Sequence, residues 1–132
     1  FIKLKNKNGN NLLHCTAFKN KHKESIDFIL NFIKNELGYN EVKKILSEPN
    51  NFNGLPLHCA VAQNNIKVFE LFFSIYVKYF KKNEIQSFLL QKVDDKSILE
   101  LARLNKENVE MFEAVKLAFE KFNPEMIKNQ AL

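Results

Sequence analysis

The stretch Asn53-Gly54-Leu55-Pro56-Leu57-His58-Cys59-Ala60 indicates a tight turn that runs into a short helix. Asn53 and Gly54 tolerate the left-handed backbone that a tight turn needs, and Pro56 presets the first turn of a helix. An earlier stretch, Gly9-Asn10-Asn11-Leu12-Leu13-His14-Cys15-Thr16, has the same pattern, with its histidine 44 residues before the other. Two copies of one turn and helix predict a repeat array, and such arrays more often recognise partners than catalyse reactions.

The segments that follow the two copies repeat as well. Apolar residues at helical spacing predict a long helix over residues 24–37, with Phe28 and Phe32 widening its apolar stripe and Gly38 ending it. Residues 66–81 predict the equivalent helix of the second copy. Apolar residues surround that second segment almost completely, so we expect it to be buried on most sides.

A short third helix is expected in each unit. Asn40 and Asn83 stand 43 residues apart, each is followed by Glu, and each is placed to act as an N-cap. The third round is more divergent and predicts a turn, two helices and the opening of a short helix at residues 94–96, 97–105, 107–121 and 123–127. We therefore predict one all-α domain of three units, at about residues 6–49, 50–92 and 93–132.

Composition narrows the classes of function. The chain has 132 residues, 45% of them hydrophobic, and only three Gly and three Pro, which favours one helical domain over many short strands. A net charge of +5 suits nucleic acid, but Arg103 is the only arginine, and base readout and bidentate phosphate contacts depend on arginine. Glu70 and Lys78 interrupt residues 66–81, which argues against a helix that spans a bilayer.

The first residue and the cysteines bear on origin and compartment. The chain begins at Phe1 rather than Met, which indicates a piece of a longer protein. Cys15 and Cys59 form no CxxC pair, which favours a reducing, cytoplasmic compartment.

These stretches resemble a known repeat family. Leu55-Pro56-Leu57-His58-Cys59-Ala60 resembles the Thr-Pro-Leu-His-x-Ala signature of ankyrin repeats, and Val68-Phe69-Glu70-Leu71-Phe72 resembles the outer helix that follows it. Asn11-Leu12-Leu13-His14-Cys15-Thr16 and Ser97-Ile98-Leu99-Glu100-Leu101-Ala102 are weaker copies. The resemblance implies an ankyrin-like helical repeat solenoid with an extra short helix in each repeat, since the family's unit is ~33 residues. Expanded repeats of this sort look like those of proteins that intracellular bacteria or protozoan parasites deliver into host cells.

Metal binding and catalysis have little support in the sequence. The pairs His14-Cys15 and His58-Cys59 contain zinc-ligand types, but they are expected on adjacent units, ~8–10 Å apart, with no third or fourth ligand. We expect each histidine to hydrogen-bond the backbone near its turn, as the resemblance also implies. The chain has no nucleophile elbow, phosphate loop or HExxH motif, and His22 has no acidic neighbour, so we predict no enzyme and no cofactor.

A binding surface is easier to predict. In ankyrin-like arrays the turn tips and the exposed face of each first helix line a concave surface. The tips are Lys7, Asn8 and Asn10; Asn51, Phe52 and Asn53; and Asp94, Asp95 and Lys96. The helix positions are Cys15, Phe18 and Lys19; Cys59, Ala62 and Gln63; and Leu101, Leu104 and Asn105. Phe18, Ala62 and Leu104 recur as an apolar strip with Phe52 at its edge, which marks an interface unless an adjoining helix or repeat covers them.

The leading hypothesis is therefore a monomeric, non-catalytic module that binds a protein partner through this concave face. The first tip carries Lys5 and Lys7 and the third Asp94 and Asp95, a polarity that would orient the partner. One alternative is a structural spacer or docking domain of a larger enzyme. Another is a surface that binds an anionic ligand or membrane through Lys19, Lys21, Lys23, Lys43 and Lys44.

Overall fold

The regular structure of the chain is helical. A computed structural model describes residues 5–19, 23–63, 66–104 and 109–123. In these ranges the regular elements are helices, apart from one isolated β-bridge between Val93 and Lys96. The helices are α1 Leu12–Lys19, α2 Lys23–Leu37, α3 Tyr39–Leu46, α4 Pro56–Ala62, α5 Ile66–Tyr79, α6 Lys82–Leu90, α7 Ile98–Arg103 and α8 Val109–Phe122. The predicted all-α class is confirmed.

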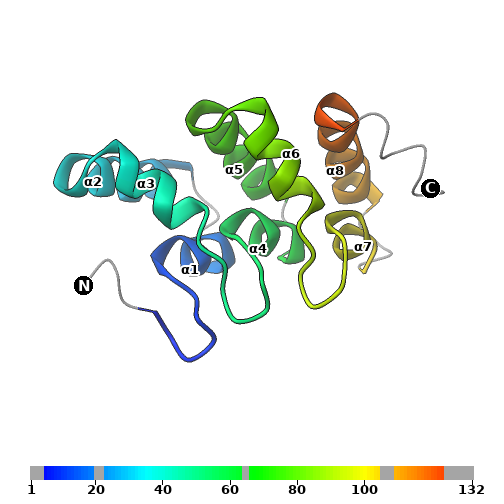
Figure 1. Cartoon of the computed structure of the whole chain (residues 1–132), viewed down its shortest axis with the longest axis horizontal. Coiled ribbons are helices and arrows are strands. Elements are labelled where there is room, and N and C mark those ends of the chain that lie inside the picture. The colour runs from blue at the N-terminus through cyan, green and yellow to red at the C-terminus, as the bar shows by residue number, and fades with distance from the viewer. Residues whose placement is uncertain (1–4, 20–22, 64–65, 105–108, 124–132) are drawn as a thin grey trace.

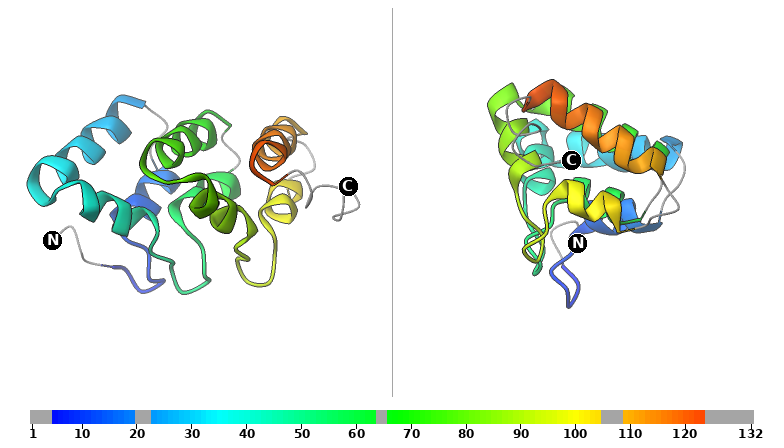
Figure 2. Two further views of the ribbon diagram at one scale, coloured as in Figure 1. Left: turned by 45° about the horizontal axis from the view of Figure 1, so that its top comes forward. Right: turned by 90° about the vertical axis from the view of Figure 1, so that its right-hand side faces the viewer.

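The helices form two layers that run along the molecule (Figure 1). The inner layer holds α1, α4 and α7, in which α4 packs against both neighbours. The outer layer holds α2, α5 and α8, and α5 packs against α8. Seen from one end, α5 lies largely behind α8, whereas α2 is tilted away from these two helices, and hairpin-like tips project below the layers (Figure 2).

Backbone hydrogen bonds join each tip to the next. The backbone N–H of Asn51 donates to the carbonyl of Asn8 at 2.9 Å, and that of Asp94 donates to the carbonyl of Phe52 at 3.0 Å. The turns require positive φ at Gly9 (77°) and, among non-glycine residues, at Asn53, Asp94 and Asp95 (69°, 51° and 66°). These are residue types that tolerate a left-handed backbone, so the tips form where turn residues cluster.

The core lies between the two layers and between successive units. The leucine of each signature, at Leu13, Leu57 and Leu99, is at most 1% exposed. Tyr76 of α5 is fully buried, and its hydroxyl donates to the carbonyl of Leu46, the last residue of α3, at 2.5 Å. That carbonyl has no partner within its own helix, so Tyr76 satisfies it while tying the second unit to the first.

The caps of the short helices differ from the prediction. Gly38, with a φ of 96°, ends α2 as expected, but α3 starts at Tyr39, so Asn40 lies inside the first turn and is not the N-cap. Likewise α6 starts at Lys82, which places Asn83 within the helix. Its N-cap is Lys81, whose backbone N–H donates to Oε1 of Glu84 at 3.0 Å. Glu84, three residues after the N-cap, thus satisfies the backbone N–H of the N-cap residue, which is the return half of a capping box.

Several helix ends and faces also need correction. Helix α5 stops at Tyr79 and α7 stops at Arg103, both inside the predicted ranges, whereas the predicted start of the last long helix at residues 107–108 lies outside the described residues. The predicted short helix at residues 123–127 lies, apart from Asn123, outside the described residues. Phe28 and Phe32 do not join the core, since they are 71% and 45% exposed. Helix α5 is buried on one broad side only, because a stripe of its residues is exposed: Lys67, Glu70, Ser74, Val77 and Lys78.

Candidate binding site

A groove opens between α4, α7 and the tips of the second and third units. We call it the α4–α7 groove. Its volume is about 310 Å³. It is lined by Asn50, Phe52, Gly54, His58, Cys59, Ala62, Val93, Asp94, Lys96, Leu101 and Leu104. The groove is therefore bounded by helix side chains on one side and by tip residues on the other.

Two large apolar side chains at the groove are open to solvent. Leu104, the C-cap residue of α7, is 65% exposed, and Phe52 on the second tip is 50% exposed. The backbone around Phe52 is held firmly, because Asn50 Oδ1 accepts the N–H groups of Phe52 at 2.9 Å and of Gly54 at 2.8 Å. The carbonyl of Phe52 accepts the N–H of Asp94. An exposed aromatic ring on a preorganised turn is a suitable anchor for a partner.

The structure brings together part of the predicted binding set. Phe52, Ala62 and Leu104 line one groove, together with Cys59, Leu101, Asp94 and Lys96. Gln63 and Asp95 are exposed beside it, and Asn53 is exposed but occupied, since its side-chain amide donates to the carbonyl of Lys92 at 2.9 Å. The side chains of Phe18 and Lys19, and the whole of Asn105, lie outside the described part of the chain.

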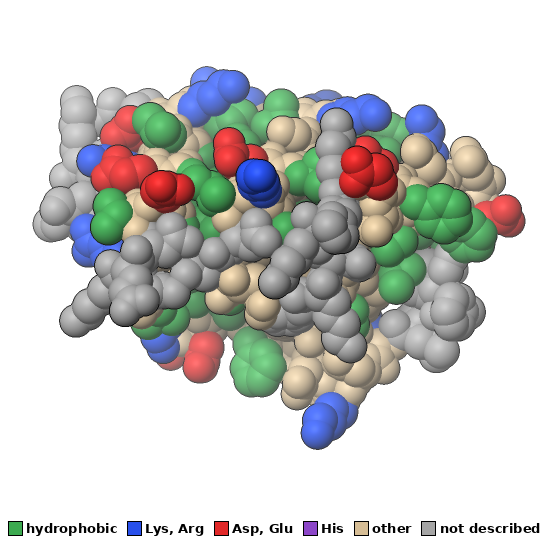
Figure 3. Space-filling view, turned by 180° about the vertical axis from the view of Figure 1, so that it is seen from behind, with side chains coloured by type: hydrophobic (Ala, Val, Ile, Leu, Met, Phe, Trp, Pro, Cys, Tyr) green, Lys and Arg blue, Asp and Glu red, His purple; other side chains and the backbone are tan. Residues whose placement is uncertain are grey.

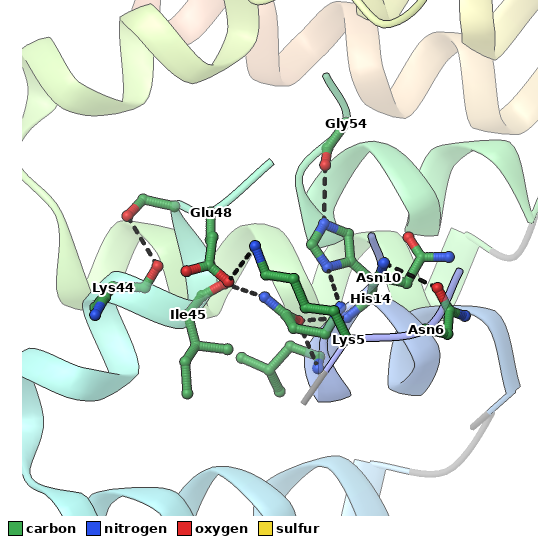
Figure 4. Close-up of polar contacts among 11 residues, drawn as sticks. Lys5, Asn6, Asn10, His14, Lys44, Ile45, Glu48 and Gly54 are labelled. Carbon is green, nitrogen blue, oxygen red and sulfur yellow. Dashed lines mark hydrogen bonds and ion pairs between the residues drawn. The ribbon is translucent and has the colours of Figure 1, made fainter. Parts of the chain in front are cut away.

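The prediction for the first tip is partly wrong. Asn10 is only 7% exposed, and its Oδ1 accepts the side-chain amide of Asn50 at 2.9 Å, so it joins two tips rather than facing a partner. Lys5 is paired with Glu48 at 3.1 Å, which partly offsets its charge (Figure 4). Lys7, the other lysine of this tip, is exposed, and its role in orienting a partner stays a prediction.

Sequence reasoning missed some groove residues. Asn50, Gly54 and Val93 line the groove, although none of them is in the predicted binding set. Val93 pairs with Lys96 across the third turn, with Asp94 and Asp95 between them. An apolar residue flanking a two-residue turn of αL-tolerant types is a hairpin signal, and it would have found Val93.

The two histidines of the signatures are structural, as predicted. Nδ1 of His14 accepts the N–H of Asn11 at 3.0 Å, and Nδ1 of His58 accepts that of Leu55 at 3.0 Å. Burial lowers the pKa of His14, and it lowers the pKa of His58 to about 4, so both rings are neutral at pH 7. Nε2 of His58 is directed towards the carbonyls of Phe88 and Gln91, which favour protonation, yet it makes no hydrogen bond of ordinary geometry.

The cysteine at the groove, Cys59, is a buried thiol. Cys15 and Cys59 are both free thiols, and burial raises the pKa of Cys59 to about 12, which keeps it protonated. Among the described residues, no three His, Cys, Asp or Glu side chains come together as metal ligands. The groove therefore offers apolar contact and a few polar groups rather than acid–base chemistry.

Among the lysines of the anion-binding alternative, Lys21 lies outside the described residues, and the other four come from two separate places in the fold. Lys43 and Lys44 belong to α3, whereas Lys19 and Lys23 flank the α1–α2 connection at the opposite ends of the helical layers (Figure 2). Lys43 Nζ also lies 5.3 Å from the ring centroid of Phe80. In the described ranges, the helices fall short of the length and apolar character that a bilayer crossing demands. Comparison with protein-family models, curated proteins and solved structures gives no match for this chain.

Proposed function

We propose that this chain is an ankyrin-type array of three expanded repeats that binds a protein partner through the α4–α7 groove. The family assignment is supported by the three signature copies, each of which opens an inner helix, and by tips that project from two helical layers. Thr16, Ala60 and Ala102, the small residues of the signature, are all at most 2% exposed. Small residues there let neighbouring inner helices approach closely.

The observation that carries the binding function is the pairing of Phe52 and Leu104 at one groove. Exposed apolar patches that are surrounded by polar side chains commonly mark interaction sites on proteins. Burying Leu104 against a partner is worth about 1–2 kcal/mol, which is roughly a tenfold gain in affinity. Asp94 and Lys96 at the rim would orient the partner rather than supply most of the affinity.

A peptide-display selection tests this proposal without a known partner. The described domain is immobilised, peptides are selected against it, and enriched sequences are synthesised and titrated by fluorescence anisotropy. The matched variants are Leu104→Asp at the groove and Leu117→Asp on α8, because both leucines are 65% exposed and lie on different surfaces. Binding that is lost in Leu104→Asp and kept in Leu117→Asp supports the groove.

The opposite results are equally clear. Peptides that bind wild type and Leu104→Asp alike would place recognition elsewhere on the molecule. A selection that enriches nothing above an unrelated helical control protein would argue against a peptide-binding role for this groove. Circular dichroism of both variants shows whether the fold is intact in each case.

A further inference from the structure

The outer helices can be compared position by position. Asp27 of α2, Glu70 of α5 and Glu113 of α8 follow one another at intervals of 43 residues, and the surrounding apolar positions align at the same offset. On this alignment, one stripe of α5 consists of Val68, Leu71, Ile75 and Tyr79, and the same stripe of α8 consists of Met111, Ala114, Ala118 and Phe122. We call this the leading stripe of each outer helix.

The leading stripe faces the preceding unit. The rings of Tyr79 and Tyr39 are 4.8 Å apart, which places the end of the α5 stripe against the start of α3. The rings of Phe122 and Phe73 are 5.6 Å apart, which places the end of the α8 stripe against α5. The end of each leading stripe thus contacts the unit before it, through α3 in the case of α5 and through α5 in the case of α8.

In α2 the same stripe is open. Its members are Ser25, Phe28, Phe32 and Glu36. Phe32 is 45% exposed, whereas Ile75 at the equivalent place in α5 is 7% exposed. Phe28 is 71% exposed, and hydrophobic side chains gather over this end of the molecule at the right of Figure 3. In the described part of the chain, Phe28 and Phe32 of the first unit are therefore exposed at places that the other two units cover more fully.

The opposite end of the array carries a surface of matching chemistry. On α8, Val109, Phe112 and Lys116 occupy the places that Ile66, Phe69 and Phe73 hold in α5. Val109 is 63% exposed, and Phe112 is half-buried with the guanidinium of Arg103 4.7 Å from its ring centroid. This trailing surface of α8 is apolar at its start and charged from Lys116 onward.

The observed contact between units sets a register for the two surfaces. Phe73 meets Phe122, and the equivalents of these positions on α8 and α2 are Lys116 and Glu36. The outer helices run in the same direction. One helical turn before Lys116 on α8 and Glu36 on α2, Phe112 therefore meets Phe32, and one turn earlier again Val109 meets Phe28. Two apolar pairs and one pair of opposite charges result.

We propose that copies of this chain associate head to tail, with α8 of one copy packed on α2 of the next. The contact continues the packing between units inside the chain, with an ion pair between Lys116 and Glu36 of the partner copy in place of two phenylalanines. The surface on α8 and the surface on α2 differ, so a pair of copies still has one free α8 surface and one free α2 surface. Further copies can therefore add at both ends, which builds open-ended chains. The sequence alone had predicted a monomer.

Sedimentation velocity over a concentration series tests this with charge reversals. Wild type is expected to associate as concentration rises, while Glu36→Lys and Lys116→Glu each weaken association by about tenfold or more. Mixing these two variants restores association, because each junction again joins opposite charges. Glu70→Lys is the control for Glu36→Lys, since it makes the same charge change on an exposed residue outside both surfaces.

Phe28→Ser provides a second, apolar test at a residue too exposed to hold the fold together. It is expected to weaken association without changing the circular dichroism spectrum. Wild type that stays monomeric up to its solubility limit would overturn the proposal. Association that both charge reversals leave unchanged, or that their mixture fails to restore, would show that copies meet through another surface.

Discussion

The imidazole of His14 joins two repeats through the carbonyl of Gly54. Nε2 of the ring lies 2.8 Å from that oxygen (Figure 4). Because Nδ1 accepts the N–H of Asn11, the proton resides on Nε2, which therefore donates to Gly54. The ring is fully buried, so one side chain closes its own turn and fixes the position of the next tip.

Replacing His14 should destabilise the whole array. His14→Ala leaves two buried backbone groups, the N–H of Asn11 and the C=O of Gly54, without their partners, which should cost about 3 kcal/mol. Urea unfolding followed by circular dichroism measures the change. Gln63→Ala, at an exposed position, is the control and should change stability by less than about 0.5 kcal/mol. Equal stability of the two variants would contradict the bridging role.

Stability should fall as the solution becomes mildly acidic. Burial lowers the pKa of His58 from 6.5 to about 4, so the unfolded chain binds a proton more readily than the folded chain. The stabilising effect of the neutral ring is complete above the unfolded pKa of 6.5 and is lost as pH falls towards 4, by about 3 kcal/mol in all. His14 acts in the same direction. Urea unfolding at a series of pH values should show this loss, and stability that is constant between pH 7 and pH 5 would contradict it.

Two glycines with positive φ should respond differently to alanine. A Cβ on Gly9 would lie 2.4 Å from Asn51 Oδ1 and 2.9 Å from the backbone N of Asn51, whereas a Cβ on Gly38 meets nothing within 4 Å. Gly38→Ala should therefore cost only the backbone strain, about 1–3 kcal/mol, because its φ of 96° and ψ of 168° lie in a region that glycine alone occupies readily. Gly9→Ala adds a clash that separates the first two tips, so its loss of stability by urea unfolding should be clearly larger. A smaller loss for Gly9→Ala would refute this account.

Much of the fold could be predicted from local signals. The signature helices and the long helices follow from apolar spacing together with Pro56 and Gly38 as boundaries. The caps could not be predicted from the asparagines, because α3 has Gly38 as its N-cap and α6 has Lys81, so both helices start before the asparagine. Capping depends on which group reaches the free N–H, and several nearby residues satisfy the sequence rule.

The groove was predictable only in part. Repeat register placed Phe52, Ala62 and Leu104 on one surface, because equivalent positions in stacked units face the same way. The repeat register could not show that the side chain of Asn10 accepts a hydrogen bond from Asn50, since that hydrogen bond depends on the distance between two tips. Nor could it show which end of the array leaves its apolar stripe uncovered, as Phe28 and Phe32 do, because periodicity reports a face and not its neighbour.

Removing the Tyr76 hydroxyl should weaken the junction between the first two units. Tyr76→Phe keeps the ring in its fully buried site but leaves the carbonyl of Leu46 without its donor. The expected loss is about 1–2 kcal/mol in urea unfolding. Val77→Ala, on the exposed side of the same helix, should cost less than half as much. A Tyr76→Phe variant as stable as wild type would mean that water or another group replaces the hydroxyl.

Groove residues and core residues should separate cleanly in stability. Leu104→Ala and Phe52→Ala remove side chains that are 65% and 50% exposed, so each should change the free energy of unfolding by less than about 1 kcal/mol. Leu57→Ala removes a side chain that is 0% exposed and should cost about 2–5 kcal/mol. Thermal melting by circular dichroism compares the three. If Leu104→Ala and Phe52→Ala destabilise the domain as much as Leu57→Ala does, these side chains are covered in solution and the groove is part of the core rather than a binding surface.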